Sequence, residues 1–440
     1  MAAPHWIVSP ATAPLRGVAR APGDKSIGHR SIMFGALASG PVRITGLGGG
    51  ADNRGTARAF AQLGVSMRSD GDALRVEGAG VHGLRAPGDV IDCGNSGTTI
   101  RLMCGLLAGQ RFDTVLTGDE SLRQRPMRRV TEPLAQMGAR IDGDTAPLTI
   151  HAAAGPLRGI DYAMPIASGQ VKSAVLLAAL YAEGETRVIE PGPTRDHTER
   201  MLRYLGAPVR SEGGGVARFD PAEWNGELAA RPIEVPGDPS SAAFLIAAAV
   251  LAGADDVRVE NVCLNPTRTG FLDALAAMGA VVHIESRRDG GPEPTGDLRV
   301  AGSDRAALRA TTIDGNLVVR SIDEIPILAV VAAMAEGTTW FRNVAELRVK
   351  ESDRIATTAA MLRAFGVTVD EQPDAFAVHG RAGQPFTPAR VDAAGDHRIA
   401  MSATVAALAA TADSRIDDVT NVATSYPAFL EALTGLRSPH

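Results

Sequence analysis

The sequence predicts an α/β protein of two domains, each built from three copies of one repeat. A length of 440 residues suits two to three domains of ordinary size. A helical segment rich in Ala and Leu, followed by a short strand pattern, occurs six times at intervals of roughly 70 residues. A second, amphipathic helix that ends at a glycine alternates with the first. Helices that alternate with strands in this way indicate α/β architecture.

The first helix of each repeat is apolar on nearly all sides, so we expect it to be buried inside a domain. A short strand follows each of these helices, as in IMFGALASGPVRITG near the start of the chain. The six segments close at a small residue, which is in turn Gly40, Gly109, Gly184, Gly253, Gly337 and Ala410.

The second helix of each repeat has one polar face and is expected on the outside of its domain. It closes at a glycine, the usual left-handed helix cap, five times: Gly64, Gly138, Gly206, Gly279 and Gly366. Strands of alternating polarity follow, for example ALRVEG after the first of these glycines. The segment RRDGGPEPTG, residues 287–296, indicates a surface insertion. Each repeat is therefore a helix, a strand, a helix and two strands.

Six repeats favour two domains of three over an open solenoid, because a solenoid needs polar capping repeats and we find none. The sixth repeat ends at YPAFLEALTGL without its closing strands. Two strand-like runs near the N-terminus, HWIVSPA and LRGVARA, are expected to complete it. We therefore predict a discontinuous domain of residues 1–20 plus 238–440 and an inserted domain of residues 21–237. The second crossing, near residues 235–241, would be a natural hinge.

Composition excludes several classes of protein. A net charge of −6 and an aromatic content of 4% argue against a nucleic-acid binder. Three cysteines without paired or zinc-like spacing predict a reducing compartment and no structural metal. The longest apolar run, residues 242–252, is shorter than the roughly 18 residues that span a membrane. The first residues lack a secretory signal pattern. We expect a soluble, cytoplasmic protein that binds neither nucleic acid nor membranes.

Polar residues precede each apolar helix, and two interpretations of them remain open. The six segments are 22–30, 92–101, 166–173, 236–241, 321–326 and 395–398. Helix capping explains their Ser, Thr, Asn, Asp and Gly residues. The second interpretation adds the charged residues Lys25, Arg30, Arg101, Asp323 and Arg398. Parallel buried helices would present their N-termini on one face of each domain, and such a face binds anions. Two faces across a hinge would then bind a polyanionic ligand.

Other motifs have a plain and a functional interpretation. The basic run RQRPMRR, residues 123–129, is most simply a solvated surface. In RVKESDR, Lys350 and Arg354 are like charges four residues apart, which indicates a shared anionic partner if the segment is helical. Cys93 beside GNSGT is either a nucleophile or, by default, a buried inert thiol.

These segments together resemble a known enzyme family. The motifs PGDKSIGHRS, GNSGTTIRL, LTGDESLRQRPM, GQVKSAVLLAAL, TRDHTE, LRVKESDR and GDHRIAMS occur in this order and extend over nearly the whole chain. They are similar to those of 5-enolpyruvylshikimate-3-phosphate synthases, or 3-phosphoshikimate 1-carboxyvinyltransferases. The resemblance implies the enolpyruvyl transferase fold, in which each of two domains holds three βαβαββ units as an inside-out α/β barrel. It places the active site in the interdomain cleft.

The resemblance also implies a reaction. The family transfers the enolpyruvyl (carboxyvinyl) group of phosphoenolpyruvate to the 5-hydroxyl of shikimate 3-phosphate and releases phosphate. The addition–elimination passes through a tetrahedral intermediate and belongs to the shikimate pathway to chorismate and aromatic amino acids. No metal or organic cofactor is implied. The expected partners are these two small-molecule substrates and the inhibitor glyphosate, and the expected state is a monomer.

Site residues follow from the resemblance position by position. Lys25 is the candidate proton donor, Asp323 accepts the 5-hydroxyl proton, and Glu351 is the candidate acid or base at the methyl carbon of the intermediate. The shikimate 3-phosphate set is Lys25, Ser26, Arg30, Ser168, Gly169, Gln170, Arg195, Asp323 and Lys350. The phosphoenolpyruvate set is Lys25, Asn95, Gly97, Arg125, Gln170, Arg354 and Arg398.

The chain departs from the family pattern at three positions. Gly28 stands where many relatives carry Ser. Gly169 stands where many carry Ser or Ala, so it can offer only its backbone N–H to a phosphate. Thr424 stands where some relatives carry a lysine, and we assign it no role. The overall pattern resembles the second, more divergent bacterial class of the family.

Two alternatives were weighed. The related transferase that acts on UDP-N-acetylglucosamine usually has Lys-Asn near its start and a loop cysteine. Here Ser26 follows Lys25, and LTGDESLRQRPM contains no cysteine. A non-catalytic anion-binding protein on the same scaffold is the other alternative, and the presence of Lys25, Asp323 and Glu351 argues against it.

Overall fold

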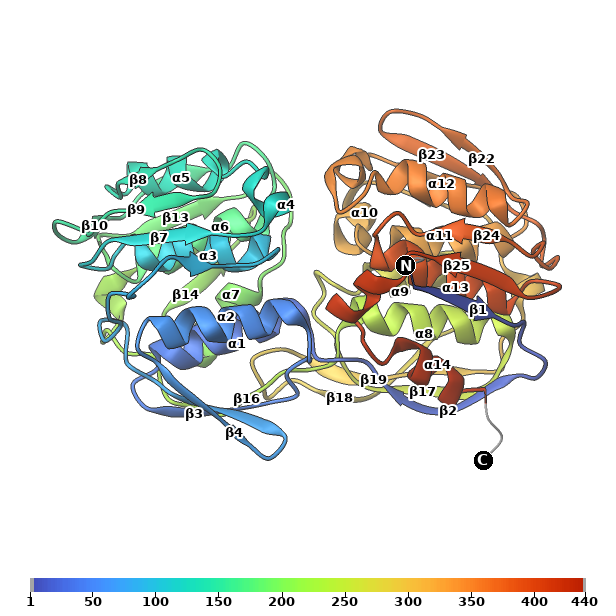
Figure 1. Ribbon diagram of the computed structural model, residues 1–440, viewed down its shortest axis with the longest axis horizontal. Coiled ribbons are helices and arrows are strands. Elements are labelled where there is room, and N and C mark those ends of the chain that lie inside the picture. Colours follow the sequence, from blue (N-terminus) through green and yellow to red (C-terminus); the bar gives the residue numbers. More distant parts are fainter. Residues whose placement is uncertain (1–3, 438–440) are drawn as a thin grey trace. The chain divides into compact units, whose positions relative to one another are not determined.

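The computed structural model describes residues 4–437, which divide into two compact units (Figure 1). One unit, here called the discontinuous unit, comprises residues 4–22, 237–289 and 294–437. The other, here called the inserted unit, comprises residues 23–236 together with the short segment 290–293. The chain therefore passes between the units next to the first and fourth buried helices.

The inserted unit contains three βαβαββ repeats, each with its own four-stranded sheet. The first sheet has the order β16-β3-β5-β4, the second β6-β7-β9-β8 and the third β11-β13-β15-β14. In each sheet the first two strands are parallel and the remaining pairs are antiparallel. The strands are β3 (Pro41–Thr45), β4 (Ser66–Asp70), β5 (Ala73–Glu77), β6 (Ile91–Asp92), β7 (Thr114–Thr117), β8 (Ile141–Asp142), β9 (Leu148–Ile150), β11 (Asp161–Ala163), β13 (Thr186–Ile189), β14 (Val209–Glu212), β15 (Val216–Phe219) and β16 (Ile233–Glu234). Two short strands, β10 (Leu157–Arg158) and β12 (Ala182–Glu183), pair separately.

The discontinuous unit repeats the pattern. Its sheets have the orders β18-β19-β17-β2, β20-β21-β23-β22 and β1-β25-β24. The strands are β1 (His5–Val8), β2 (Leu15–Arg20), β17 (Ala254–Cys263), β18 (His283–Arg288), β19 (Thr295–Ala301), β20 (Thr312–Ile313), β21 (Thr338–Arg342), β22 (Thr368–Glu371), β23 (Ala375–His379), β24 (Arg390–Asp392) and β25 (Ser414–Asp417). The six-repeat α/β organisation expected from the sequence is confirmed.

One predicted pairing at the N-terminus is right and one is wrong. β1 pairs with β25 of the sixth repeat, with His5 opposite Asp417, as expected. β2 does not join the sixth repeat, because it runs parallel to β17 of the fourth, with Arg20 opposite Glu260. The long strand β17 would otherwise leave one edge of backbone groups unpaired, and β2 satisfies them. Its apolar Leu15 is fully buried there.

The apolar helices form the interior of each unit, as predicted. In the inserted unit they are α1 (Lys25–Leu37), α3 (Gly97–Leu107) and α6 (Gly169–Ala179), and in the discontinuous unit α8 (Pro239–Ala252), α11 (Ile325–Met334) and α13 (His397–Leu408). α3 packs against α1 and α6, while α8, α11 and α13 pack against one another (Figure 1). Every residue from 239 to 251 is buried. A helix that is apolar all round can lose its entire surface to a core in this way.

The second helices are more polar and frame the repeats. They are α2 (Ala51–Gln62), α5 (Arg128–Gln136), α7 (His197–Tyr204), α9 (Gly270–Ala277), α12 (Arg354–Ala364) and α14 (Phe429–Gly435), joined by the short helices α4 (Glu120–Arg123) and α10 (Gly315–Ser321). Gly64 and Gly138 follow α2 and α5 with φ of 88° and 98°, which confirms the expected left-handed caps. Among the described residues, no helix has both the length and the apolar character to span a membrane.

The segment expected as a surface insertion has a buried member. Residues 290–293 connect β18 to β19, yet they belong to the inserted unit. The Glu293 side chain is fully buried there, with Oε1 2.6 Å from Nδ1 of His197. The prediction is wrong for residues 292–294 and 296, which are all buried. A charged side chain with a buried partner, as Glu293 has, leaves no sign in a Gly- and Pro-rich sequence.

Candidate active site

The three buried helices of the inserted unit begin at capped N-termini. The Asp24 carboxylate accepts a hydrogen bond from the backbone N–H of Ile27 at 2.9 Å. The Ser96 hydroxyl accepts one from Thr99 at 3.1 Å, and Ser168 caps α6 in the same way. Helix capping is therefore confirmed here, and each cap leaves further backbone N–H groups of the first turn for a ligand.

Long polar side chains join these helix starts to one another. The Arg101 guanidinium donates to Oε1 of Gln170 at 2.7 Å, which connects α3 to the start of α6. The amide of Gln170 donates in turn to the Thr98 hydroxyl at 3.1 Å. The predicted ligand Gln170 is therefore held by residues of the neighbouring helix before any substrate arrives.

Arg30 is a buried cation with most of its donors occupied. Its Nε donates to the Thr198 hydroxyl at 2.7 Å, and one Nη donates to the Ser173 hydroxyl at 2.8 Å. The other Nη donates to the Ser26 carbonyl oxygen at 3.0 Å. Burial lowers the pKa of Arg30 to about 10, so it remains positively charged at neutral pH. A cation held among neutral hydroxyls is an attractive partner for a phosphate.

Lys25 is the first residue of α1 and is paired with an acidic residue. Its ammonium lies 3.1 Å from the carboxylate of Asp52 on α2. The side chain of Lys25 is 41% exposed and that of Asp52 is 19% exposed. The pair holds the ammonium at the helix start while leaving it accessible to a ligand.

Asn95, Gly97 and Arg125 form one contiguous group. The Arg125 guanidinium donates to the Asn95 side-chain oxygen at 2.9 Å, and the Asn95 amide donates to Asp119 at 2.7 Å. A Cβ atom added to Gly97 would lie 3.2 Å from Nη1 of Arg125 and 2.9 Å from Nη1 of Arg101. Glycine at this position therefore lets two guanidinium groups approach the start of α3.

Gly169 lies directly against the segment that carries Arg195. A Cβ atom added at residue 169 would lie 3.2 Å from the Arg195 carbonyl oxygen and 3.5 Å from its Cβ. The fold thus brings Arg195 next to Ser168, Gly169 and Gln170, which the resemblance assigned to the same substrate.

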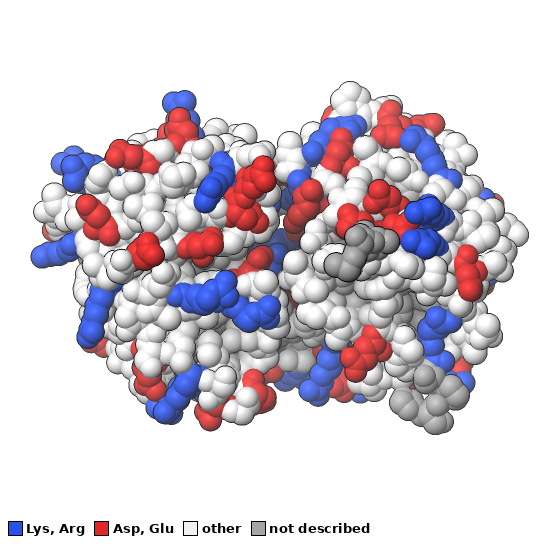
Figure 2. All heavy atoms as spheres, in the orientation of Figure 1, with Lys and Arg blue, Asp and Glu red and all other residues white. Residues whose placement is uncertain are grey.

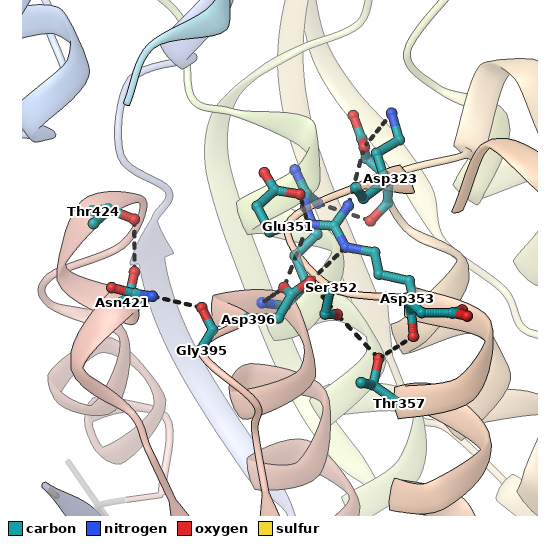
Figure 3. A network of polar contacts seen from close by, with 12 residues as sticks. Asp323, Glu351, Ser352, Asp353, Thr357, Gly395, Asp396, Asn421 and Thr424 are labelled. Carbon is teal, nitrogen blue, oxygen red and sulfur yellow. Dashed lines mark hydrogen bonds and ion pairs between the residues drawn. The ribbon is translucent and has the colours of Figure 1, made fainter. Parts of the chain in front are cut away.

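The discontinuous unit holds a second cluster, centred on Arg354. This guanidinium is 1% exposed, and its Nε donates to Asp396 at 2.8 Å. One Nη donates to Glu351 at 2.7 Å, and the other lies 3.4 Å from an oxygen of Asp323. Figure 3 shows Asp323, Glu351, Ser352 and Asp396 gathered around one guanidinium group. Three carboxylates share this cation, which stabilises their charges.

These ion pairs change the protonation of the acids. Burial would raise the pKa of Glu351, but Arg354, His397 and Arg398 outweigh it and lower the pKa to about 2. Asp396 is affected in the same direction, because Arg354 outweighs its burial. Glu351 is therefore a carboxylate at neutral pH and can accept a proton.

Asp323 is flanked by cations on more than one side. The Lys350 ammonium lies 3.8 Å from its carboxylate, and the Arg398 guanidinium donates to its backbone carbonyl oxygen at 2.9 Å. The adjacent Glu324 is 1% exposed and lies 3.7 Å from Arg398. Burial is the main cause that raises the pKa of Glu324. The side chains predicted in this unit are thus collected around Asp323.

Thr424, which received no role, makes only a local contact. Its hydroxyl donates to the carbonyl oxygen of Asn421 at 2.7 Å, and the Asn421 amide donates to Gly395 at 2.6 Å (Figure 3). This chain links the segment after β25 to the turn before α13. It therefore supports the turn that precedes Arg398.

Sequence reasoning gave no role to three acidic partners of the site, Asp52, Glu324 and Asp396, and it named Arg101 only as a charged residue near a helix start. Asp52, Arg101, Glu324 and Asp396 hold Lys25, Gln170, Arg398 and Arg354 respectively. Two of the acids had a signal, since Glu324 and Asp396 lie within the polar segments 321–326 and 395–398. Asp52 had none beyond its place in a glycine-rich helix start.

The surface in Figure 2 carries both signs of charge. Lys and Arg side chains alternate with Asp and Glu side chains over the visible face of each unit. Ion pairs between partly exposed side chains include Arg218 with Asp220 at 3.0 Å and Arg299 with Asp256 at 2.7 Å.

We expect the native protein to resist thiol reagents. Cys93, Cys104 and Cys263 are all buried and unpaired by disulfides. Burial raises the pKa of Cys93 and raises that of Cys104 to about 12, so the reactive thiolate is scarce. Titration with a chromogenic disulfide at pH 8 should detect less than about one thiol per native chain and all three in denaturant. Rapid reaction of a native thiol with loss of activity would revive the nucleophile interpretation of Cys93.

Comparisons with known proteins agree with the motifs. A family model for EPSP synthase (3-phosphoshikimate 1-carboxyvinyltransferase) matches residues 10–433. A relative from Alkalilimnicola ehrlichii, named 3-phosphoshikimate 1-carboxyvinyltransferase, is 52% identical over 95% of this chain and 92% of its own length. One of the same name from Geobacter sulfurreducens is 50% identical, over 95% and 96%. The solved structure of EPSP synthase from Acinetobacter baumannii aligns with a TM-score of 0.90 and 42% identity over 98% of both chains. The chain therefore belongs to the EPSP synthase family.

Proposed function

We propose that the chain transfers the enolpyruvyl group of phosphoenolpyruvate to the 5-hydroxyl of shikimate 3-phosphate, giving 5-enolpyruvylshikimate 3-phosphate and phosphate. Membership of the EPSP synthase family over residues 10–433 carries this proposal. The reaction belongs to the shikimate pathway to chorismate and aromatic amino acids. It needs sites for two anions, a base for the hydroxyl and an acid for a carbon atom.

Shikimate 3-phosphate is assigned to the groups near Arg30. Its phosphate would accept hydrogen bonds from Ser26, Ser168 and Arg195 and from the free N–H groups at the start of α6. The buried positive charge of Arg30 supports this assignment, because a charged hydrogen-bonded pair is stronger than a neutral one. Gly169, Gln170, Asp323 and Lys350 are assigned to the rest of the molecule.

Phosphoenolpyruvate is assigned to a largely separate set of cations. Arg125, beside Asn95 and Gly97, would bind its phosphate in the inserted unit. Arg354 and Arg398 would bind its carboxylate and phosphate in the discontinuous unit, where a planar guanidinium suits both groups. The remaining members of this set are Lys25 and Gln170.

Asp323, Lys25 and Glu351 are assigned to the proton transfers of the reaction. Asp323 takes the proton of the 5-hydroxyl while the oxygen attacks C2 of phosphoenolpyruvate and Lys25 donates a proton to the methylene carbon. Phosphate then leaves C2 of the tetrahedral intermediate, and Glu351 removes a proton from the new methyl group to form the vinyl ether. The low pKa of Glu351 keeps its side chain in the carboxylate form, which is the form that can accept this proton.

The direct test is phosphate release. Purified protein is incubated with both substrates and with each substrate omitted, and inorganic phosphate is measured. We expect release only when both are present. UDP-N-acetylglucosamine in place of shikimate 3-phosphate should give none, and release with that substrate instead would overturn the proposal.

Glyphosate should inhibit the enzyme by competing with phosphoenolpyruvate, and Gly97→Ala should weaken that inhibition. The added methyl group would lie 3.2 Å from Nη1 of Arg125, on the side assigned to phosphoenolpyruvate. Packed sites are sensitive to single methyl groups, so the longer inhibitor should suffer more than the substrate. The inhibition constant should therefore rise more than the KM of phosphoenolpyruvate. Equal rises, or an insensitive parent enzyme, would contradict the steric argument.

The chain is also proposed to act as a monomer in the cytoplasm. Three buried cysteines that form no disulfide suit a reducing compartment. Light scattering should give a mass near 45.7 kDa, whereas twice that mass would contradict the proposed monomer.

A further inference from the structure

The chain uses lysine at only three positions. Of 44 basic Lys and Arg residues, only Lys25, Lys172 and Lys350 are lysines. Two of the three are already assigned to the substrates. Because arginine is used almost everywhere else, a lysine indicates a position where a compact ammonium fits and a planar guanidinium does not. Lys172 is the one lysine without an assigned role.

Lys172 is the centre of a buried ion triad in the inserted unit. Its side chain, on α6, is 3% exposed. The ammonium lies 2.6 Å from Oε1 of Glu199 on α7, and it also pairs with Glu190, which follows β13. The side chains of Glu199 and Glu190 are 2% and 6% exposed. One cation thus joins three separate segments of the chain.

The ammonium of Lys172 is charged at neutral pH, whereas burial raises the pKa of Glu199 despite its pairing with Lys172. Burial would lower the pKa of Lys172, but Glu199 and Glu190 outweigh it and raise the pKa. Removing the ammonium would leave two carboxylates close together in a water-poor site. Buried charges without partners are strongly unfavourable, so the segments would have to move apart or take up protons.

Glu190 connects the triad to Arg195. Its carboxylate accepts hydrogen bonds from the backbone N–H of Thr194 at 2.9 Å and from the Thr194 hydroxyl at 3.1 Å. Thr194 immediately precedes Arg195, whose backbone packs on Gly169. The Lys172–Glu190 pair thereby determines where the Arg195 segment begins.

Residues adjoining the triad also hold Arg30. Thr198, next to Glu199, accepts from Nε of Arg30 at 2.7 Å. Ser173, next to Lys172, accepts from Nη2 of Arg30 at 2.8 Å and also receives a bond from Thr198 at 2.8 Å. Each arginine assigned to shikimate 3-phosphate is thus linked to the triad through one intervening residue. Arg30 is linked through Ser173 or Thr198, and Arg195 through Thr194.

We propose that Lys172 is a positioning residue for shikimate 3-phosphate, which places Arg195 through Glu190 and Arg30 through the start of α7. The inference rests on the proposed function, because it concerns the affinity for that substrate. It does not place Lys172 in contact with a ligand. A purely structural ion triad would stabilise the unit without any preference for one substrate, and the two roles therefore predict different kinetics.

Lys172→Met keeps the length of the side chain and removes its charge. We expect the KM of shikimate 3-phosphate to rise at least about 10-fold, while the KM of phosphoenolpyruvate and kcat stay within about 3-fold. Lys172→Arg should also raise the KM of shikimate 3-phosphate, by about 5-fold, because a larger planar group overpacks a filled site. Recovery of the parent KM in the arginine variant would show that charge alone suffices and would overturn the positional argument.

Thr194→Val tests the link without removing the buried charge. It deletes the hydroxyl that donates to Glu190 and preserves side-chain shape, so the triad remains intact. We expect a rise of about 3-fold or more in the KM of shikimate 3-phosphate. Thr186→Val is the matched control, because the hydroxyl of Thr186 is buried in the same unit and has no hydrogen-bond partner. The control should leave both KM values unchanged.

The outcomes separate the two claims. Failure of the parent enzyme to release phosphate from its two substrates would end the proposed function and, with it, this inference. An active parent with unchanged KM values in Lys172→Met and Thr194→Val would overturn the role of Lys172 alone. Should Lys172→Met fail to fold, the comparison of Thr194→Val with Thr186→Val decides.

Discussion

Lys25→Met should lower turnover at saturating substrates by at least about 100-fold, the usual scale for a lost general acid. The ammonium stands at the start of α1, 3.1 Å from Asp52, and is 41% exposed. Methionine fills a similar volume but can neither donate a proton nor attract an anion. A single residue assigned to both substrates should also raise both KM values.

The measurement is initial-rate phosphate release over a matrix of both substrate concentrations. Arg58→Met is a suitable control, because Arg58 is an exposed cation on the neighbouring helix α2 and has no assigned role. The control should retain nearly full activity. Near-normal kcat in Lys25→Met, with only the KM values raised, would make Lys25 a binding residue and remove it from proton transfer.

Asp323→Asn should produce a fall in turnover of about 100-fold or more, with little change in the affinity for shikimate 3-phosphate. Asparagine preserves shape but cannot take the hydroxyl proton. The carboxylate lies 3.4 Å from Arg354 and 3.8 Å from Lys350, so its loss also removes negative charge next to two cations that are assigned to the anionic substrates. Binding of the anionic substrates should consequently be maintained.

Affinity is measured separately from turnover, by calorimetric titration with shikimate 3-phosphate. Asp314→Asn serves as the control, since Asp314 is an exposed acid just before α10 whose side chain makes no capping bond. A variant of Asp323 that retains turnover and loses affinity would show that this carboxylate only orients the ring.

The repeat could be predicted because its signals are local. Apolar helices and glycine caps recur within short windows, and each buried helix from α1 to α13 has the expected position. The partner of β2 could not be predicted in the same way, because strand pairing joins segments far apart and the strand pattern itself does not name its neighbour.

The sequence names the candidate site residues one by one, and it does not indicate the environment of each. Motifs identified Lys25, Arg30 and Arg354, but not that the guanidinium of Arg354 is 1% exposed among three carboxylates. The low pKa of Glu351 depends on Arg354, three residues along the chain, and on His397 and Arg398 from a distant segment. Burial and contacts between distant segments arise from tertiary packing, and a short stretch of sequence does not show them.

The late partners of the N-terminal strands impose an order on biosynthesis. Residues 23–236 supply nearly all of the inserted unit, so it can fold once about half of the chain has left the ribosome. β1 precedes the inserted unit in the chain, yet its partner is β25 (Ser414–Asp417), and the Tyr426 hydroxyl donates to the Arg20 carbonyl 406 residues away. β2 can pair once β17 has been synthesised, whereas the edge of β1 stays open to chaperones or to aggregation until β25 has followed. β1 is therefore the first of the described strands to be synthesised and among the last of them to pair.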